Sequence, residues 1–386
     1  MKRILLVVET SRVYGRGIVT GISQFALEHG GWQIHFEDRG LLEGPSEWLR
    51  KWKGDGIISR AATEEVHRIL KKKRCPIVEL HGDNRNNRSE VQICDESIAR
   101  MAAEHFMERG FRQFGVYSCF ALWWTVARQE FFEARLRQHG FSCHIYSDTL
   151  IKKEQLHPTW ENRFEKPLKK WLSTLPKPIG IWVSTDQQAI RVHGACVELG
   201  FQIPEDIAIL GTSNDTLICN LLTPPLSSID TNGATIGYEA ARRLALKMEG
   251  RSPPKSVVLI PPLQVVVRQS TDVIAVPDPD FAAVLHYIRT HACTGLTVLQ
   301  VCETMGLSRR SLERHFMKYL NRSPHDEIMR IRINQAKALL QGTALSLRAI
   351  AKKVGFCSRE YFSSVFHREV GMSPNNYRNK KQRFLK

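Results

Sequence analysis

The sequence lacks any apolar run near the roughly 20 residues that span a bilayer. The apolar run at residues 4–8 ends at Glu9, short of the roughly seven or more residues of a secretory signal. Hydrophobic residues make up 42% of the chain and the mean hydropathy is −0.27, values typical of a soluble globular protein. We therefore expect a soluble protein of the cytoplasm in which residues 4–8 form a buried strand.

The nine cysteines offer no recognisable metal site or disulfide framework. They are dispersed, without a C-x-x-C pair and without histidines at metal-ligand spacing. An odd, scattered set is typical of reduced cytosolic thiols. We expect neither a bound metal nor a cofactor.

Enzymatic motifs are missing as well. The chain has no G-x-S-x-G, no Walker-type phosphate loop, no metal-spaced histidine pair and no nucleophile placed beside a base. These absences argue against an enzyme.

Acidic residues are scarce in the last quarter of the chain. Residues 278–386 hold 19 Lys and Arg against 8 Asp and Glu, which is +11 of the total charge of +16. The first 277 residues are nearly balanced, with 36 basic and 31 acidic residues. A polyanionic partner, either nucleic acid or membrane phosphate, is therefore expected for the last quarter alone.

This basic part nearly repeats itself. Helix-turn-helix units are expected at about residues 296–320 and 346–370, turning at Gly306 and Gly355. Residues 324–341 form a long amphipathic helix between them. A separation of about 34 Å between the two second helices would let both enter successive major grooves of DNA.

Each second helix has an apolar face and a polar face. Leu312 and Phe316, like Phe362 and Phe366, are spaced i, i+4 and are expected in the core. Arginine can bind guanine through two hydrogen bonds, glutamate can accept from cytosine, and serine can contact base or phosphate. A charged face is usually only solvated surface, but the duplication, the linking helix and the local charge favour DNA contact here. The expected DNA-binding residues are Ser308, Arg309, Arg310, Glu313, Arg314, Ser358, Arg359, Glu360, Ser363, Ser364 and His367.

The end of the chain resembles the AraC/XylS family. Residues 355–378 read G-F-x-S-x-x-Y-F-S-x-x-F-x-x-x-x-G-x-S-P-x-x-Y-R, and residues 332–340 read R-x-x-x-A-x-x-L-L, like the linker helix of that family. The resemblance implies an all-α double helix-turn-helix domain that binds promoter DNA. Asn321 stands where the family often has glycine, and asparagine tolerates the same left-handed conformation.

Two prolines mark the boundary of this domain. The segment V-P-D-P-D at residues 276–280 cannot continue a helix, and Asp280 is suited to cap the helix that follows. We expect a ligand-sensing domain at residues 1–275, a linker at 276–280 and the DNA-binding domain at 281–386.

The first domain alternates strand-like and helix-like segments. Its predicted helices include residues 17–29, 128–138 and 189–199, and a strand at residues 207–210 closes the series. The alternation predicts an α/β fold with parallel sheets in two lobes. Ligands of such folds bind beyond the carboxyl ends of the strands.

Three short sequence segments in this domain resemble the LacI/GalR sensor domain, which is itself similar to periplasmic sugar-binding proteins. They are I-P-E-D-I-A-I-L-G at residues 203–211, T-P-P-L-S-S-I at 223–229 and R-Q-S-T at 268–271. The resemblance implies a two-lobe, periplasmic-binding-protein-like sensor that closes on a small carbohydrate. Joined to an AraC/XylS-type domain, the whole chain resembles bacterial regulators of pentose operons.

A sugar site needs planar donors and acceptors that pair with neighbouring hydroxyls. Arg128 and the pair at residues 185–186 match positions where the resemblance implies ligand contacts, although Asp186 is equally suited to be only a helix N-cap. Ser213 replaces the usual Asp of the family, which weakens the case for xylose unless Asp215 substitutes. The expected ligand-binding residues are Glu9, Tyr14, Arg128, Thr185, Asp186, Ser213, Asn214 and Asp215.

The expected function is therefore a sugar-responsive regulator, an activator of pentose (xylose-like) catabolic genes. Its expected partners are promoter DNA, a sugar effector such as D-xylose, RNA polymerase and a second copy of the chain. Two alternatives stay open. One is an enzyme acting on a sugar or nucleotide and fused to a DNA-binding module, which turnover of a bound sugar would reveal. The other is a ligand-independent DNA binder, which no sugar would stabilise.

Overall fold

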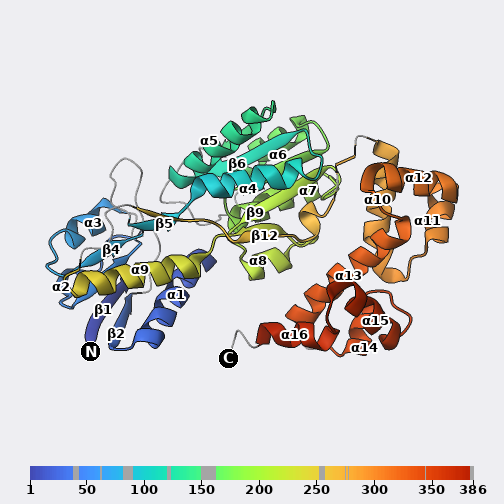
Figure 1. Ribbon diagram of the computed structural model, residues 1–386. Helices are drawn as coiled ribbons and strands as arrows, with labels where there is room; N and C mark the ends of the chain where they lie inside the picture. Colours follow the sequence, from blue (N-terminus) through green and yellow to red (C-terminus); the bar gives the residue numbers. More distant parts are fainter. Residues whose placement is uncertain are drawn as a thin grey trace. The chain divides into compact units, whose positions relative to one another are not determined.

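The computed structural model describes residues 1–37, 43–60, 63–80, 90–119, 123–148, 162–251, 257–273, 275–276, 278–343 and 345–382. The chain divides into two compact units, Met1–Ala275 and Val276–Lys386 (Figure 1). None of the helices within the described ranges is long and apolar enough to cross a membrane.

The first sheet of the first unit is parallel, with strand order β2-β1-β3-β4. Side chains alternate across strand β1, so that Ile4 and Leu6 face one core while Leu5 and Val7 face another. Helices α1 and α9 cover the first face, and α2 and α3 cover the second. The elements are β1 (Lys2–Val7), α1 (Val13–His29), β2 (Trp32–Glu37), α2 (Glu47–Lys51), β3 (Gly56–Ser59), α3 (Glu64–Leu70), β4 (Ile77–Glu79) and α9 (Gly233–Met248).

The second sheet has strand order β12-β10-β9-β8-β6-β7, parallel except for β12. Helices α4 and α5 cover one face, and α6 and α7 cover the other. The elements are α4 (Asp95–Met107), β6 (Phe114–Cys119), α5 (Trp123–Gln138), β7 (His144–Asp148), α6 (Asn162–Thr174), β8 (Ile179–Val183), α7 (Asp186–Glu198), β9 (Ile207–Thr212), α8 (Thr216–Leu221), β10 (Ser227–Asp230), β12 (Gln264–Val266) and the 3-10 turn η2 (Gln269–Thr271).

The chain passes between the two sheets three times. It leaves the first lobe after β5 (Val91–Ile93), returns between β10 and α9, and leaves again after β11 (Val258–Ile260), which pairs with β5. The Cys94 N–H donates to the carbonyl of Ile260 over 2.8 Å, and the Leu263 N–H donates to Asp230 over 2.9 Å. Hydrogen bonds therefore join the crossing segments to one another.

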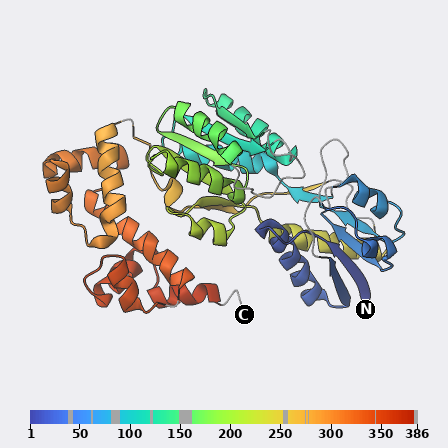
Figure 2. The ribbon, with the colours of Figure 1, turned by 180° about the vertical axis from the view of Figure 1, so that it is seen from behind.

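Helix α9 packs closely against α1, although more than 200 residues separate them in sequence (Figures 1 and 2). A Cβ atom on Gly21 would lie 1.9 Å from the carbonyl oxygen of Ala234, and one on Gly237 would lie 1.9 Å from that of Ile18. Only glycine permits this approach of the two backbones.

The second unit is helical, as expected from its sequence. Its two helix pairs, α11 with α12 and α14 with α15, flank the long helix α13. Phe281, Leu312, Phe316, Phe362 and Phe366 are all buried. The elements are α10 (Pro279–His291), the 3-10 turn η3 (Ala292–Thr294), α11 (Val298–Met305), α12 (Arg309–Leu320), α13 (Pro324–Gly342), α14 (Leu347–Lys353), α15 (Arg359–Val370) and α16 (Pro374–Gln382).

The structure corrects some expected details. Asp278, not Asp280, caps α10, because Pro279 occupies the first helical position and the Asp278 carboxylate accepts from the Phe281 N–H over 3.2 Å. The expected helices at residues 17–29 and 128–138 begin earlier, at Val13 and Trp123. The two-lobe α/β fold and the helical domain after it are confirmed.

Candidate ligand pocket and nucleic-acid interface

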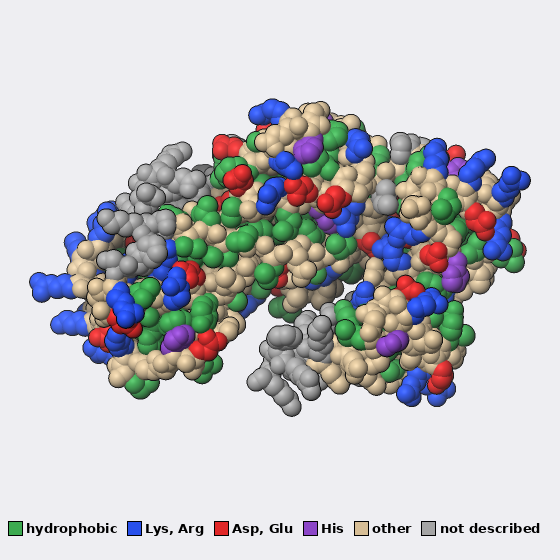
Figure 3. Space-filling view, viewed as in Figure 1, with side chains coloured by type: hydrophobic (Ala, Val, Ile, Leu, Met, Phe, Trp, Pro, Cys, Tyr) green, Lys and Arg blue, Asp and Glu red, His purple; other side chains and the backbone are tan. Residues whose placement is uncertain are grey.

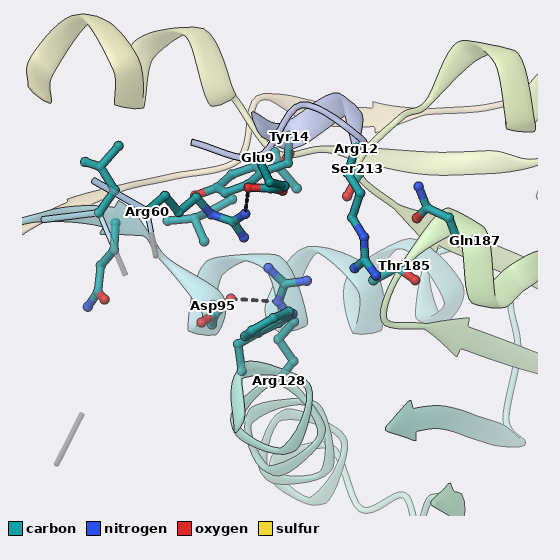
Figure 4. A pocket seen from close by; sticks show the side chains of 14 residues that line it. Glu9, Arg12, Tyr14, Arg60, Asp95, Arg128, Thr185, Gln187 and Ser213 are labelled. Carbon is teal, nitrogen blue, oxygen red and sulfur yellow. Dashed lines mark hydrogen bonds and ion pairs between the residues drawn. The ribbon is translucent and has the colours of Figure 1, made fainter. Parts of the chain in front are cut away.

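A pocket lies in the first unit where the strands of both sheets end and the crossing segments begin. Its lining combines charged, hydroxyl and aromatic side chains from both lobes (Figure 4). The lining residues are Glu9, Arg12, Tyr14, Arg60, Leu80, Gln92, Ile93, Asp95, Trp124, Arg128, Thr185, Gln187, Ser213 and Thr231.

Glu9 and Arg60 form a buried ion pair on one side of this pocket. Glu9 follows β1 and Arg60 follows β3, so that parallel neighbouring strands bring them together. The Arg60 guanidinium also lies 4.5 Å from the centre of the Tyr14 ring. The second carboxylate oxygen of Glu9, Oε1, is buried and has no hydrogen-bond partner among the described residues. Burial raises the pKa of Tyr14 to about 12, so this phenol stays neutral.

Arg128 and Asp95 form the second ion pair of the pocket. Arg128 Nε donates to Asp95 Oδ1 over 2.6 Å, and its Nη1 donates to the carbonyl oxygen of Ser184 over 3.2 Å. Burial raises the pKa of Asp95, while the Arg128 charge acts in the opposite direction. The pair orients the remaining nitrogen of the guanidinium, and Figure 4 shows that end of Arg128 pointing into the pocket.

The pocket lining includes five of the eight residues expected from the sequence, namely Glu9, Tyr14, Arg128, Thr185 and Ser213. Sequence reasoning missed other polar lining residues. Position is the signal for two of them, because Arg60 directly follows β3 and Asp95 comes two residues after β5, although position alone did not set Asp95 apart in the sequence. The missed polar residues are Arg12, Arg60, Gln92, Asp95, Gln187 and Thr231.

Asp186, Asn214 and Asp215 lie outside the described lining and hold the neighbouring loop together. Asp186 accepts from the Asp215 N–H over 2.7 Å and from the Ser228 hydroxyl over 2.6 Å. Burial raises the pKa of Asp186 to about 6, although both hydrogen bonds favour the ionised form. Thr185, rather than Asp186, is the N-cap of α7.

Asp215 is the N-cap of α8, and its carboxylate also forms an ion pair with Arg16 over 3.3 Å. Asn214 donates to Asp230 and accepts from Arg268, over 3.2 and 2.9 Å. The neighbouring Ser213, at the position of the usual Asp, reaches the pocket with a backbone φ of 114°.

The expected DNA-contacting face of each second helix is open to solvent. On α12 and its cap all five expected residues are exposed, while Leu312, Phe316 and Leu320 are buried on the opposite face. Ser308 caps α12 and Ser358 caps α15 through their hydroxyls. On α15 and its cap, four expected residues are exposed and two are half-buried, the latter being Ser358 and Ser363.

The linking helix α13 connects the two helix pairs through Arg332. This buried guanidinium donates to the carbonyls of Ala292 and Leu296 over 2.7 and 2.9 Å, and lies 5.8 Å from the centre of the Phe356 ring. Gly355 lies against the same turn, since a Cβ there would be 2.9 Å from the carbonyl oxygen of Cys293. These contacts hold the two pairs in a fixed arrangement.

Asn321 adopts the left-handed conformation expected of it, with φ of 50°. Figure 3 shows basic side chains over the visible face of the second unit, with acidic and apolar side chains among them.

Comparisons with known proteins agree with this arrangement. Family descriptions match three segments: an XylR N-terminal domain at residues 3–94, a periplasmic binding protein-like domain at 103–271 and a helix-turn-helix domain at 301–380. The chain is 28% identical to the xylose operon regulatory protein of Escherichia coli over 97% of this chain and 96% of that one. It is 29% identical to the protein of that name from Haemophilus influenzae, over 97% of this chain and 98% of that one.

A solved structure described as the xylose-binding transcription activator xylR is also similar. It is 27% identical in sequence with a TM-score of 0.78, and the match covers 98% of both chains. The resemblance expected from the sequence is thereby confirmed, and so is the expectation of a transcriptional regulator rather than an enzyme, because these relatives are regulators.

Proposed function

We propose that this chain, a sugar-responsive transcriptional regulator with a helix-turn-helix DNA-binding domain, binds a pentose-sized sugar such as xylose in the pocket of its first unit. The supporting observation is Glu9 Oε1, which is buried in the pocket and has no hydrogen-bond partner in the described part of the chain. A buried acceptor without a donor costs roughly 1–3 kcal/mol. A sugar hydroxyl would supply that donor.

The lining residues then have distinct roles toward such a sugar. Arg60 and Arg128 donate to ring or hydroxyl oxygens, Thr185 and Ser213 exchange hydroxyl hydrogen bonds, and the Trp124 ring covers the apolar face. In this proposal the three expected residues outside the lining, Asp186, Asn214 and Asp215, position the Ser213 loop and do not contact the ligand.

The second unit, residues 281–386 after the linker at 276–280, binds promoter DNA in this proposal. The exposed Arg309, Arg310, Glu313 and Arg314 of α12 read base edges in one major groove. The exposed face of α15 contacts the next major groove. Ser308 at the start of α12 and Ser358 at the start of α15 contact phosphates. The contacts of Arg332 support the proposal, because they fix the spacing of the two helices.

We also propose that the regulator acts as a homodimer in the cytoplasm and contacts RNA polymerase at the promoter as an activator. The role as an activator is supported by the similarity over nearly the full length to xylose operon regulatory proteins and to a solved transcription activator.

A thermal-shift screen of D-xylose, L-arabinose and D-ribose tests the sensor assignment. A ligand at 100 times its dissociation constant stabilises the folded state by about 2.7 kcal/mol, which raises Tm measurably. We expect at least one pentose to do so, and Arg128→Ala to abolish the shift. Arg135→Ala on the same helix is the matched control, because its side chain lies outside the pocket lining and pairs with Glu104. No shift with any pentose would contradict the assignment and favour a ligand-independent DNA binder.

A further inference from the structure

The first turn of α10 lies next to the covalent connection between the two units. Its N-cap, Asp278, comes three residues after Ala275, the last residue of the first unit. The Asp278 carboxylate accepts from the Phe281 N–H over 3.2 Å, so the connecting segment is hydrogen-bonded to the helix that it enters. A displacement of the chain at Ala275 therefore acts on the start of α10 first.

The same turn of α10 contacts α12 through aromatic rings. Phe281 is buried and stacks on His315 and Tyr319 of α12, with ring centroids 5.6 and 5.3 Å apart. The Phe316 ring meets Phe281 edge-on, at 5.1 Å. Asp278 Oδ2 also lies 3.8 Å from His315 Nε2. Since aromatic pairs stabilise a contact beyond the area that they bury, the start of α10 and helix α12 are expected to move together.

The other end of α10 is held against the second helix pair. The turn η3 follows α10 directly, and the carbonyl of Ala292 in this turn accepts from the buried Arg332 over 2.7 Å. Gly355, between α14 and α15, lies against the same turn, since a Cβ there would be 2.9 Å from the carbonyl oxygen of Cys293. A displacement that enters at the start of α10 therefore moves α12 relative to α15.

Helix α12 is also the more basic of the two candidate recognition helices. It has four basic residues and one acidic residue, whereas α15 has two of each. Arg310 and Arg314 form no hydrogen bond or ion pair within the described residues, whereas Arg368 on α15 pairs with Glu369 over 2.9 Å. Because phosphate attraction dominates DNA affinity, a movement of α12 should change promoter affinity more than the same movement of α15.

We propose that α10 carries the ligand state of the first unit to α12, and that Phe281 and His315 are the positioning residues of this connection. The inference rests on the proposed function, since it names the regulatory route between the pocket and the promoter-binding face. When a sugar occupies the pocket, a displacement at Asp278 moves α12, and Arg310 and Arg314 change their contacts in one half of the promoter site. The contacts of α15 in the other half stay as they were.

Promoter titrations of the full chain, with and without D-xylose, L-arabinose or D-ribose, test this route in variants of His315. We expect the pentose that binds to change the promoter Kd of the native chain by about fivefold or more. His315→Ala should bind that pentose equally well, but its promoter Kd should change by less than about twofold. A general loss of stability in the second unit would alter both Kd values alike and leave their ratio unchanged. His315→Phe keeps a ring that can stack on Phe281 and should keep most of the response.

His325→Ala is the matched control for His315→Ala. His325 Nδ1 also lies 3.8 Å from a carboxylate oxygen, that of Asp326, but its side chain is exposed at the start of α13. This variant should respond to the pentose like the native chain. A native-like response of His315→Ala would overturn the inference, and so would a bound pentose that leaves the native promoter Kd unchanged. Both results would leave the pocket assignment standing, whereas absence of binding by every pentose would overturn both.

Hydroxyl-radical footprinting of the native chain on its promoter is a second measurement, which needs no change in α10 or its contacts. The half-site of α12 is the one in which Arg314→Ala loses its base preference. We expect the pentose to change the protection of this half while the protection of the other half stays the same. Equal changes in both halves would overturn the route through α12.

Discussion

Asp186 is a buried carboxyl group of the first unit whose effect on the stability of the fold depends on pH. Its folded-state pKa is raised to about 6 by burial, from an ordinary value of 3.8. The folded protein therefore holds this proton more tightly than the unfolded chain. Protonated Asp186 stabilises the folded state below about pH 4, and this stabilisation is lost as pH rises through about 6.

We compare the free energy of unfolding of the native protein with that of Asp186→Asn. The difference, native minus variant, should fall by up to about 3 kcal/mol between pH 4 and pH 7, because each pKa unit corresponds to about 1.4 kcal/mol. Urea denaturation of both proteins at four pH values measures the difference, and the variant is a reference that does not titrate at this position. A difference independent of pH would show that burial does not control this carboxyl group.

Residues of the pocket were only partly predictable from the sequence. Arg128 was found through a resemblance, and Glu9 through its position after a strand. Arg60 was missed because its role depends on Glu9, 51 residues away, which only the pairing of β1 with β3 brings near. Asp215 looked like a ligand contact, but its contacts with Arg16 and α8 involve partners that the local sequence does not reveal.

At the scale of elements, helix faces in the second unit followed directly from the sequence, because the 3.6-residue period is local. Helix α9 was not predicted. Its packing against α1 depends on glycines in both helices and on the return of the chain from the second lobe. The short strands β5 and β11 were missed for a similar reason, since each has only three residues and pairs with a distant partner.

The contact between α1 and α9 gives a prediction about packing. Gly237→Ala should destabilise the first unit by roughly 1–3 kcal/mol, because the new methyl group would force the two helix backbones apart. Gly194→Ala in α7 is the matched control, since a Cβ there meets nothing within 4 Å. Alanine at that helical position should be neutral or stabilising by up to about 1 kcal/mol. Similar effects of the two substitutions in denaturant titrations would argue against the close approach.

The exposed face of α12 gives a prediction about base recognition. Arg310→Ala or Arg314→Ala should weaken binding to the native promoter site by roughly 1–3 kcal/mol and relax the preference at one base pair. Competition assays with single-base variants of the site measure both effects. The control is Arg251→Ala in the first unit, where binding should not change. If the arginine variants lose as much affinity for random DNA as for the native site, these side chains contact phosphates rather than bases.

For the whole molecule, we expect a sugar bound in the first unit to control promoter binding by the second. Neither unit alone explains a regulator, because the described ligand pocket lies in residues 1–275 and the candidate DNA-contacting faces lie in residues 276–386. Occupancy of one site changes affinity at the other only if the ligand binds the two DNA-binding states differently. The free energy that couples sugar binding to promoter binding can therefore be measured.

The most direct measurement is fluorescence anisotropy of a labelled promoter fragment titrated with the native chain and with Arg128→Ala, each with and without the sugar that shifts Tm most. We expect the sugar to change the promoter Kd of the native chain by about fivefold or more. We expect Arg128→Ala to bind the promoter like the sugar-free native chain and to ignore the sugar. A native chain that binds the sugar without any change in promoter Kd, or an Arg128→Ala variant that responds to sugar like the native chain, would contradict this control of promoter binding by the sugar.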